Sequence, residues 1–136
     1  MTGMFEWSDE FATGVGSVDA QHRMLFQIGA ELYTAMSTGE GRAASNRILD
    51  KLVQYTAKHF AHEERLMQNA EYPELAAHRK QHEALTKQVM SFQNQVRSGR
   101  AVVTVQLLLF IKSWLEDHIK NTDRKYAPLL KAKAVA

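Results

Sequence analysis

The strongest constraint on the fold is a spacing of apolar residues by three and four in four successive segments of the chain. This spacing predicts amphipathic helices, each with one buried stripe. The stripes cover residues 18–36, 48–66, 75–96 and 103–118. No segment alternates with a period of two for long enough to predict a strand. The fold class is therefore all-α, and an antiparallel up-down-up-down four-helix bundle is the simplest assembly of these pieces.

Glycine, asparagine and proline residues between the stripes predict where the helices end. Gly39 and Gly41 follow the first stripe, Asn69 and Pro73 the second, and Gly99 the third. The fourth stripe is expected to fray at Asn121.

A length of 136 residues predicts a single domain with one core. We expect an N-terminal arm over residues 1–16, the bundle over 17–120 and a C-terminal segment over 121–136. The C-terminal segment begins irregularly, and is expected to end in one short docked turn and a solvated tail.

Composition excludes several functional classes. The chain has no cysteine, which excludes disulfides, thiol catalysis, iron–sulfur clusters and thiolate zinc sites. With 17 basic and 15 acidic side chains, its net charge of +2 favours neither nucleic acid nor an anionic membrane as a partner. Residues 101–115 are too short and too often interrupted by polar residues to span a membrane. The first ten residues lack a basic region before an apolar stretch, so we expect a cytoplasmic protein.

Histidines occupy positions in the apolar stripes where leucine would be expected. Every one of the four predicted helices carries at least one such residue. An unpartnered imidazole in a core costs about 2–7 kcal/mol, so each requires a compensating interaction. In an up-down-up-down bundle, these positions share one end, because helices one and three begin where helices two and four finish. The residues concerned are His22, His59, Glu63, His78, His82 and His118.

Two helices can each offer a pair of ligands. His59 with Glu63, and His78 with His82, are spaced i, i+4 and so lie on one helix face. Asp123 follows His118 by five residues, which an α-helix would rotate by about 140°. Asp123 can join the site only if the helix breaks first, and we predict that break at Asn121–Thr122, with Asn121 as a left-handed cap.

Taken one at a time, these histidines do not require a metal ion. One histidine in an apolar stripe is more often a hydrogen-bonded core residue than a ligand. Five at one depth would need five separate hydrogen-bonding solutions, so metal is the simpler explanation. His62 is interpreted as a satisfied or partly exposed histidine at the bundle edge, and Glu64 with Arg65 as a solvated face.

The ligand set points to two transition-metal ions. Five histidines and two carboxylates are too many for one tetrahedral zinc ion, and too rich in imidazole for calcium or magnesium. The His-Glu-x-x-His signature of zinc peptidases is absent. The Glu-x-x-His motif of di-iron carboxylate proteins is absent as well.

With these residues in this order, the chain resembles the hemerythrin family over essentially its whole length, and is most similar to the single-domain bacterial members. The matching motifs are Asp19-Ala20-Gln21-His22, His59-Phe60-Ala61-His62-Glu63-Glu64, Tyr72-Pro73, His78 with His82, and Trp114 with His118-Ile119 and Asp123.

The resemblance implies a di-iron centre. One iron would be bound by His78, His82 and His118, and the other by His22 and His59. Glu63, Asp123 and an oxo or hydroxo group from solvent would bridge them. The first iron would then be six-coordinate and the second five-coordinate, with its open position facing a dry pocket.

The function that the resemblance implies is reversible binding of O2, for storage, delivery or buffering, with no side chain acting as acid or base. An apolar lining would exclude water and reductants. Its candidates, one turn from the ligands, are Leu25, Phe26, Leu66, Met67, Leu85, Trp114, Leu115 and Ile119.

Three other functions use the same centre. A di-iron enzyme could act on peroxide or nitric oxide, although few carboxylates argue against it. A sensor of O2 or redox state would need a partner protein to provide its output. Iron storage would need an oligomer, whereas we expect a monomer, whose partner in O2 delivery could be an O2-consuming enzyme.

Overall fold

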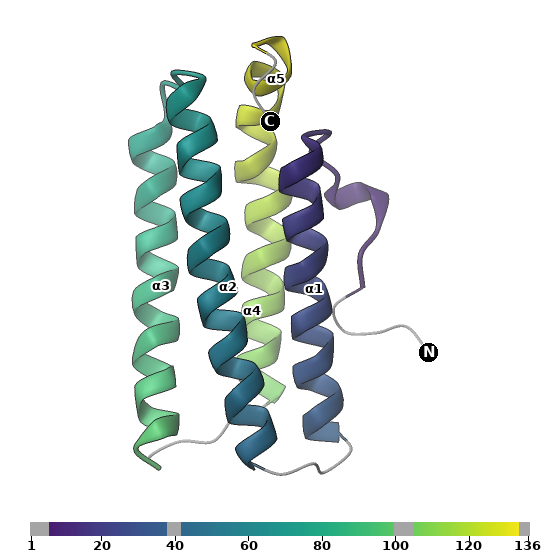
Figure 1. Ribbon diagram of the computed structural model, residues 1–136, viewed down its shortest axis with the longest axis vertical. Coiled ribbons are helices and arrows are strands. Elements are labelled where there is room, and N and C mark those ends of the chain that lie inside the picture. Colours follow the sequence, from purple (N-terminus) through teal and green to yellow (C-terminus); the bar gives the residue numbers. More distant parts are fainter. Residues whose placement is uncertain (1–5, 38–41, 100–104, 134–136) are drawn as a thin grey trace.

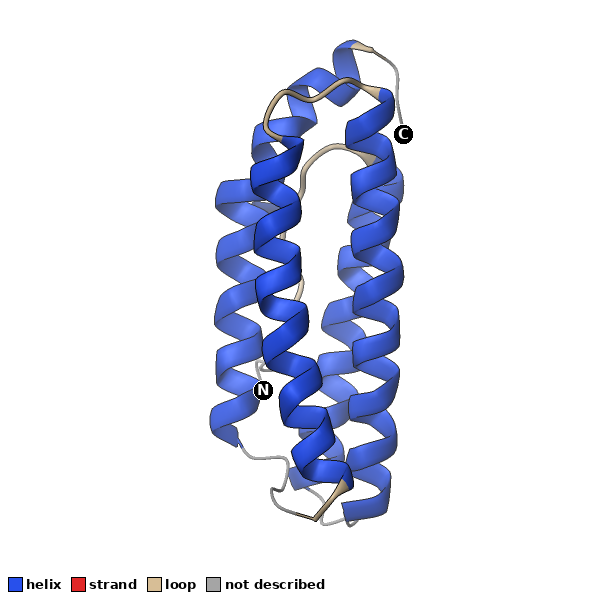
Figure 2. Cartoon of the chain, turned by 90° about the vertical axis from the view of Figure 1, so that its left-hand side faces the viewer, coloured by secondary structure: helices blue, strands red, loops and turns tan. Residues whose placement is uncertain are grey.

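Four long helices form an antiparallel bundle, as the apolar spacing predicts (Figure 1). The computed structural model describes residues 6–37, 42–99 and 105–133. The long helices are α1 (Gly16–Ser37), α2 (Arg42–Asn69), α3 (Leu75–Arg97) and α4 (Val105–Asp117). A 3-10 turn (η1, Asp9–Phe11) lies in the N-terminal arm. The described part of the chain contains helices and connecting loops but no strand (Figure 2).

The helices run up, down, up and down, so that α1 packs against α2 and α4, and α2 packs against α3. The beginnings of α1 and α3 therefore lie at the same end as the C-terminal end of α2. Within the described ranges, no helix is both long enough and apolar enough to cross a membrane.

Three of the predicted helix ends can be compared with the structure, and the ends of the second and third helices are confirmed. α2 ends at Asn69, and its C-terminal turn closes with Glu71 in the left-handed region at φ 58°. α3 ends at Arg97, and Gly99 then adopts φ +79°, which glycine accommodates without a Cβ clash. Gly39 and Gly41, and the start of the fourth stripe at Val103, lie outside the described residues.

The apolar core consists of two clusters separated by polar residues. One cluster includes Leu25 and Leu52, and the other includes Val18 and Leu66. Along α1, His22 therefore lies between members of the two clusters. The seven predicted site residues occupy a polar layer between the two apolar clusters.

The predicted helix break after His118 is wrong. The chain continues from α4 through a π-helix (η2, His118–Asp123) directly into α5 (Arg124–Ala132). Asn121 is not a left-handed cap, because Glu71 is the one non-glycine residue with positive φ among those described. A π-helix bonds residue i to i+5, so it brings residues five apart onto one face without interrupting the helix. The wider π-helical turn thus brings Asp123 to the site, for which we had predicted a break in the helix.

The C-terminal segment is also more regular than predicted. In place of an irregular stretch and one docked turn, α5 spans nine residues and includes Pro128. Its Tyr126 and Leu130 are fully buried in the second apolar cluster. Residues 134–136 of the expected tail lie outside the described residues.

Candidate metal centre

All seven predicted site residues converge in the interior of the bundle. Each is at most 5% exposed, and Glu63 and Asp123 are fully buried. Their donor atoms form two overlapping groups, and within each group the atoms lie within 4.8 Å of one another. The first group is Glu63, His78, His82, His118 and Asp123. The second is His22, His59, Glu63 and Asp123. The two carboxylates therefore belong to both groups.

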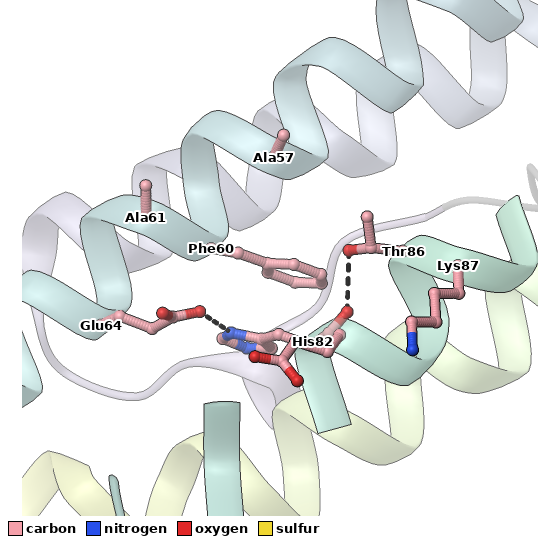
Figure 3. A pocket seen from close by; sticks show the side chains of 8 residues that line it. Ala57, Phe60, Ala61, Glu64, His82, Thr86 and Lys87 are labelled. Atoms are coloured by element: carbon pink, nitrogen blue, oxygen red, sulfur yellow. Dashed lines mark hydrogen bonds and ion pairs between the residues drawn. The ribbon is translucent and has the colours of Figure 1, made fainter. Parts of the chain in front are cut away.

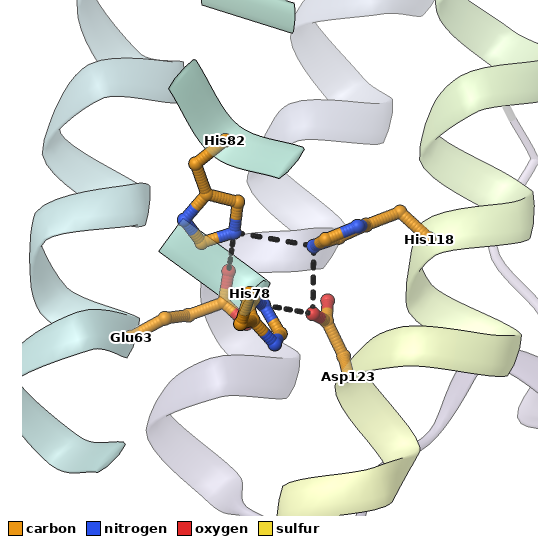
Figure 4. Close-up of side chains that lie close together, drawn as sticks. All are labelled: Glu63, His78, His82, His118 and Asp123. Atoms are coloured by element: carbon orange, nitrogen blue, oxygen red, sulfur yellow. Dashed lines mark hydrogen bonds and ion pairs between the residues drawn. The ribbon is translucent and has the colours of Figure 1, made fainter. Parts of the chain in front are cut away.

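The first group joins α2, α3 and η2 (Figure 4). Asp123 Oδ1 lies 2.9 Å from His118 Nε2 and 3.1 Å from His78 Nε2. Glu63 Oε1 lies 3.6 Å from His82 Nε2. The Nε2 atoms of His82 and His118 face each other at 3.1 Å. Three imidazoles and two carboxylates thus point their donor atoms at a common volume.

The second group joins α1 and α2 to the same carboxylates. His22 Nε2 lies 3.1 Å from Asp123 Oδ2, and His59 Nε2 lies 2.8 Å from Glu63 Oε1. The two oxygens of Asp123 are therefore divided between the groups, one toward His22 and the other toward His78 and His118. A carboxylate divided in this way can bridge two ions.

Several buried nitrogen and oxygen atoms that could bind a metal ion in the centre have no hydrogen-bond partner. They include both ring nitrogens of His22 and His78, both oxygens of Asp123, and Glu63 Oε1. Although some of these atoms lie about 3 Å apart, their angles do not meet hydrogen-bond geometry. Unsatisfied buried polar atoms are costly, and bound cations would satisfy them. The donor set, nitrogen-rich and without thiolate, fits transition-metal ions better than calcium or magnesium.

Two glutamines orient the imidazoles of two candidate ligands, from the side opposite Nε2. His59 Nδ1 donates to Gln21 Oε1 at 2.7 Å, and His118 Nδ1 donates to Gln81 Oε1 at 3.1 Å. A proton held on Nδ1 leaves the Nε2 lone pair free for a metal ion. We did not predict these partners. Their only local signal is that each glutamine directly precedes a stripe histidine, His22 or His82.

The interpretation of Glu64 as a solvated residue is wrong. Glu64 Oε2 accepts a hydrogen bond from His82 Nδ1 at 2.9 Å (Figure 3). Its other oxygen pairs with Arg79 Nε at 3.0 Å. Its side chain is only 22% exposed, because α3 covers it. A carboxylate behind an imidazole raises the basicity of that ligand. The same region contains a pocket of about 390 Å³, whose lining includes Phe60, Glu64 and His82.

Burial and the neighbouring charges shift the pKa values of His82 and Asp123 in the directions that suit metal binding. Desolvation lowers the pKa of His82 to about 4, even though Glu63 and Glu64 raise it. Burial alone would raise the pKa of Asp123, but His118, with His22 and His78, holds that pKa well below its usual value. A neutral imidazole and an ionised carboxylate are the forms that bind a cation.

His62 lies outside both ligand groups, in agreement with its interpretation as an edge residue. It is half-buried, with Nε2 3.0 Å from Ser17 Oγ and Nδ1 3.2 Å from Arg65. Burial and the nearby Arg65 lower its pKa.

The residues predicted to line the centre divide between the two apolar clusters. Four belong to the first cluster: Leu25, Phe26, Leu115 and Ile119. Leu66 and Met67 belong to the second, and Leu85 is buried outside both. Trp114 is only half-buried, and its ring stacks on His118 with centroids 4.4 Å apart.

The site has known counterparts in sequence. The Hemerythrin HHE cation binding domain matches residues 13–130. Bacteriohemerythrin of Methylococcus capsulatus is 35% identical over 123 residues, covering 90% of this chain and 93% of that protein. A hemerythrin chain of Sipunculus nudus is 35% identical over 126 residues, covering 93% of each chain.

The fold has counterparts among solved structures. The crystal structure of wild-type hemerythrin superposes with a TM-score of 0.88 at 34% identity, over 92% of this chain and 96% of that one. The family match at residues 13–130 extends over all the elements that provide the seven residues. The chain therefore belongs to the hemerythrin family.

Proposed function

We propose that this protein binds O2 reversibly at a pair of iron ions, for storage, delivery or buffering of oxygen. The ions would be held by His22, His59, Glu63, His78, His82, His118 and Asp123. The observation that carries the proposal is the pair of overlapping ligand groups that share both carboxylates. A shared pair of carboxylates holds two ions next to each other, as two-electron chemistry requires.

The two groups differ in size, and the difference favours an open coordination position. The first group supplies three imidazoles and two carboxylates, whereas the second supplies two imidazoles and the same two carboxylates. The second ion would therefore have one protein ligand fewer than the first. A bound ferrous pair supplies the electrons that O2 takes up and returns.

The chain's own contribution is positional. Gln21, Gln81 and Glu64 fix the ring orientations of three ligands, and the apolar clusters on both sides keep the layer dry. Exclusion of water strengthens electrostatic interactions inside the site and suppresses side reactions.

Metal analysis followed by oxygen exposure tests the proposal. We expect about two irons per chain, and a visible band that appears when the anaerobically reduced protein meets O2 and disappears when O2 is removed. His78→Ala should lose iron and the band, whereas His62→Ala should keep both. A protein without iron would overturn the proposal, and rapid decay of the band with turnover of peroxide would favour an enzyme instead.

A further inference from the structure

The phenol of Tyr126 contacts the centre from outside the ligand set. Its hydroxyl donates a hydrogen bond to Glu63 Oε2 at 2.5 Å. The residue lies on α5 and is fully buried. Its ring packs at 5.6 Å from that of His78 and at 6.3 Å from that of Tyr72. Tyr126 therefore links the C-terminal helix directly to a carboxylate that both ligand groups share.

This hydrogen bond makes the two shared carboxylates unequal. Both oxygens of Asp123 face ligand histidines and have no hydrogen-bond donor. In Glu63, Oε1 faces His59, while Oε2 accepts the phenol proton. One shared carboxylate thus divides its negative charge between the metal site and a neutral donor, and the other does not.

We propose that Tyr126 is a positioning residue that fixes the orientation of Glu63 and weakens its electron donation to the metal pair. This inference rests on the proposed function. A short hydrogen bond to a carboxylate is strong and directional, so it restricts rotation of the carboxyl group. Charge drawn toward the phenol is not available to the ions, which favours their reduced, ferrous state.

Tyr72 offers a matched control. It belongs to the same apolar cluster, is 9% exposed, and also donates its hydroxyl to a carboxylate, Glu74 Oε2 at 3.3 Å. Glu74 is in neither ligand group. Removing the Tyr72 hydroxyl therefore alters a tyrosine–carboxylate pair in the same cluster without altering the centre.

The test compares Tyr126→Phe and Tyr72→Phe with the unaltered iron-loaded protein. For Tyr126→Phe we expect a metal affinity at least about tenfold weaker in chelator competition, as for other outer partners of metal ligands. We also expect a lower midpoint potential, because the oxidised pair gains electron density from Glu63. Tyr72→Phe should change neither quantity. Equal affinities and potentials in all three proteins would overturn the inference.

A second measurement avoids dependence on the folding of the variant. Replacement of all tyrosines by 3-fluorotyrosine leaves the packing nearly unchanged and makes each phenol a stronger donor. We expect the midpoint potential to rise, and to do so equally in the Tyr72→Phe background. An unchanged potential would contradict the inference while the iron content remained at about two. Absence of iron from the unaltered protein would instead refute the proposed function.

Discussion

His118 and Asp123 face each other at 2.9 Å although they are five residues apart, because the chain between them forms a π-helix. In an α-helix, the same separation would turn the two side chains about 140° apart. The rare turn therefore places the fourth helix's imidazole and the shared carboxylate on one face. π-helical turns are frequent at functional sites, and this one has a direct structural purpose.

Insertion of one residue into the π-helix should destroy the centre without unfolding the bundle. An alanine inserted after the exposed Asn121 places His118 and Asp123 six residues apart, a separation that neither an α-helical nor a π-helical turn brings onto one face. We expect helix content to be retained and iron content to fall by at least half. Asn121→Ala keeps the chain length and should retain both ions. Full iron occupancy in the insertion variant would show that the π-helical register is not required.

Asp123→Ala should remove both ions. This side chain is fully buried. It contacts His78 and His118 of the first ligand group and His22 of the second. Its loss leaves each ion one carboxylate short and the histidines without a counter-charge. Asp117→Ala, at an exposed position just before His118, should have no effect on iron content measured by elemental analysis. If Asp123→Ala still held two irons, the bridging role would be wrong.

Loss of the carboxylate behind His82 should weaken metal binding. Glu64→Ala removes the acceptor of His82 Nδ1, and outer partners of this kind are worth about 10–100-fold in metal affinity. Arg79→Ala should have a much smaller effect, because its side chain is 45% exposed and surface ion pairs contribute little. Glu83→Ala alters an exposed carboxylate in the lining of the same pocket and serves as the control. Chelator competition measures all three, and equal affinities for Glu64→Ala and Glu83→Ala would contradict the assignment.

The stability contributed by His82 in the metal-free protein should depend on pH. Its pKa is about 4 when folded and 6.5 when exposed, so the unfolded chain binds more protons between these values. The free energy of unfolding therefore falls as pH decreases from 6.5 to 4, by up to about 3 kcal/mol from this group. In urea unfolding, the free energy of unfolding of the wild type should fall more steeply than that of His82→Gln as pH decreases from 6.5 to 4. A difference that stayed constant with pH would contradict the lowered pKa.

Stability of the bundle and occupancy of the centre should be separable. Leu32 is fully buried in the first apolar cluster and belongs to neither ligand group. Leu32→Ala should cost about 2–5 kcal/mol in the free energy of unfolding. At temperatures where the variant is folded, its iron content should equal that of the wild type. Loss of iron from the folded variant would indicate that the core and the centre are coupled.

The fold and six of the seven candidate ligands, all except Asp123, could be predicted from the sequence, because helical periodicity reports which face of a segment is buried. Once His22, His59, His78 and His118 fell on buried faces, the up-down order of the helices placed them at one depth. This argument needs only the spacing within each helix and the alternation of helix direction. The structure agrees with it.

The surroundings of the ligands depended on the tertiary structure. Gln21 meets His59 across 38 residues of sequence, and Tyr126 meets Glu63 across 63. Periodicity within one helix contains no information about which side chain of another helix faces it. The π-helix was equally hidden, because an extra residue in one turn leaves no distinct mark on a short stretch of polar residues. Sequence spacing therefore determined which side chains point inward, whereas packing between helices decided which partners orient them and how Asp123 reaches the centre.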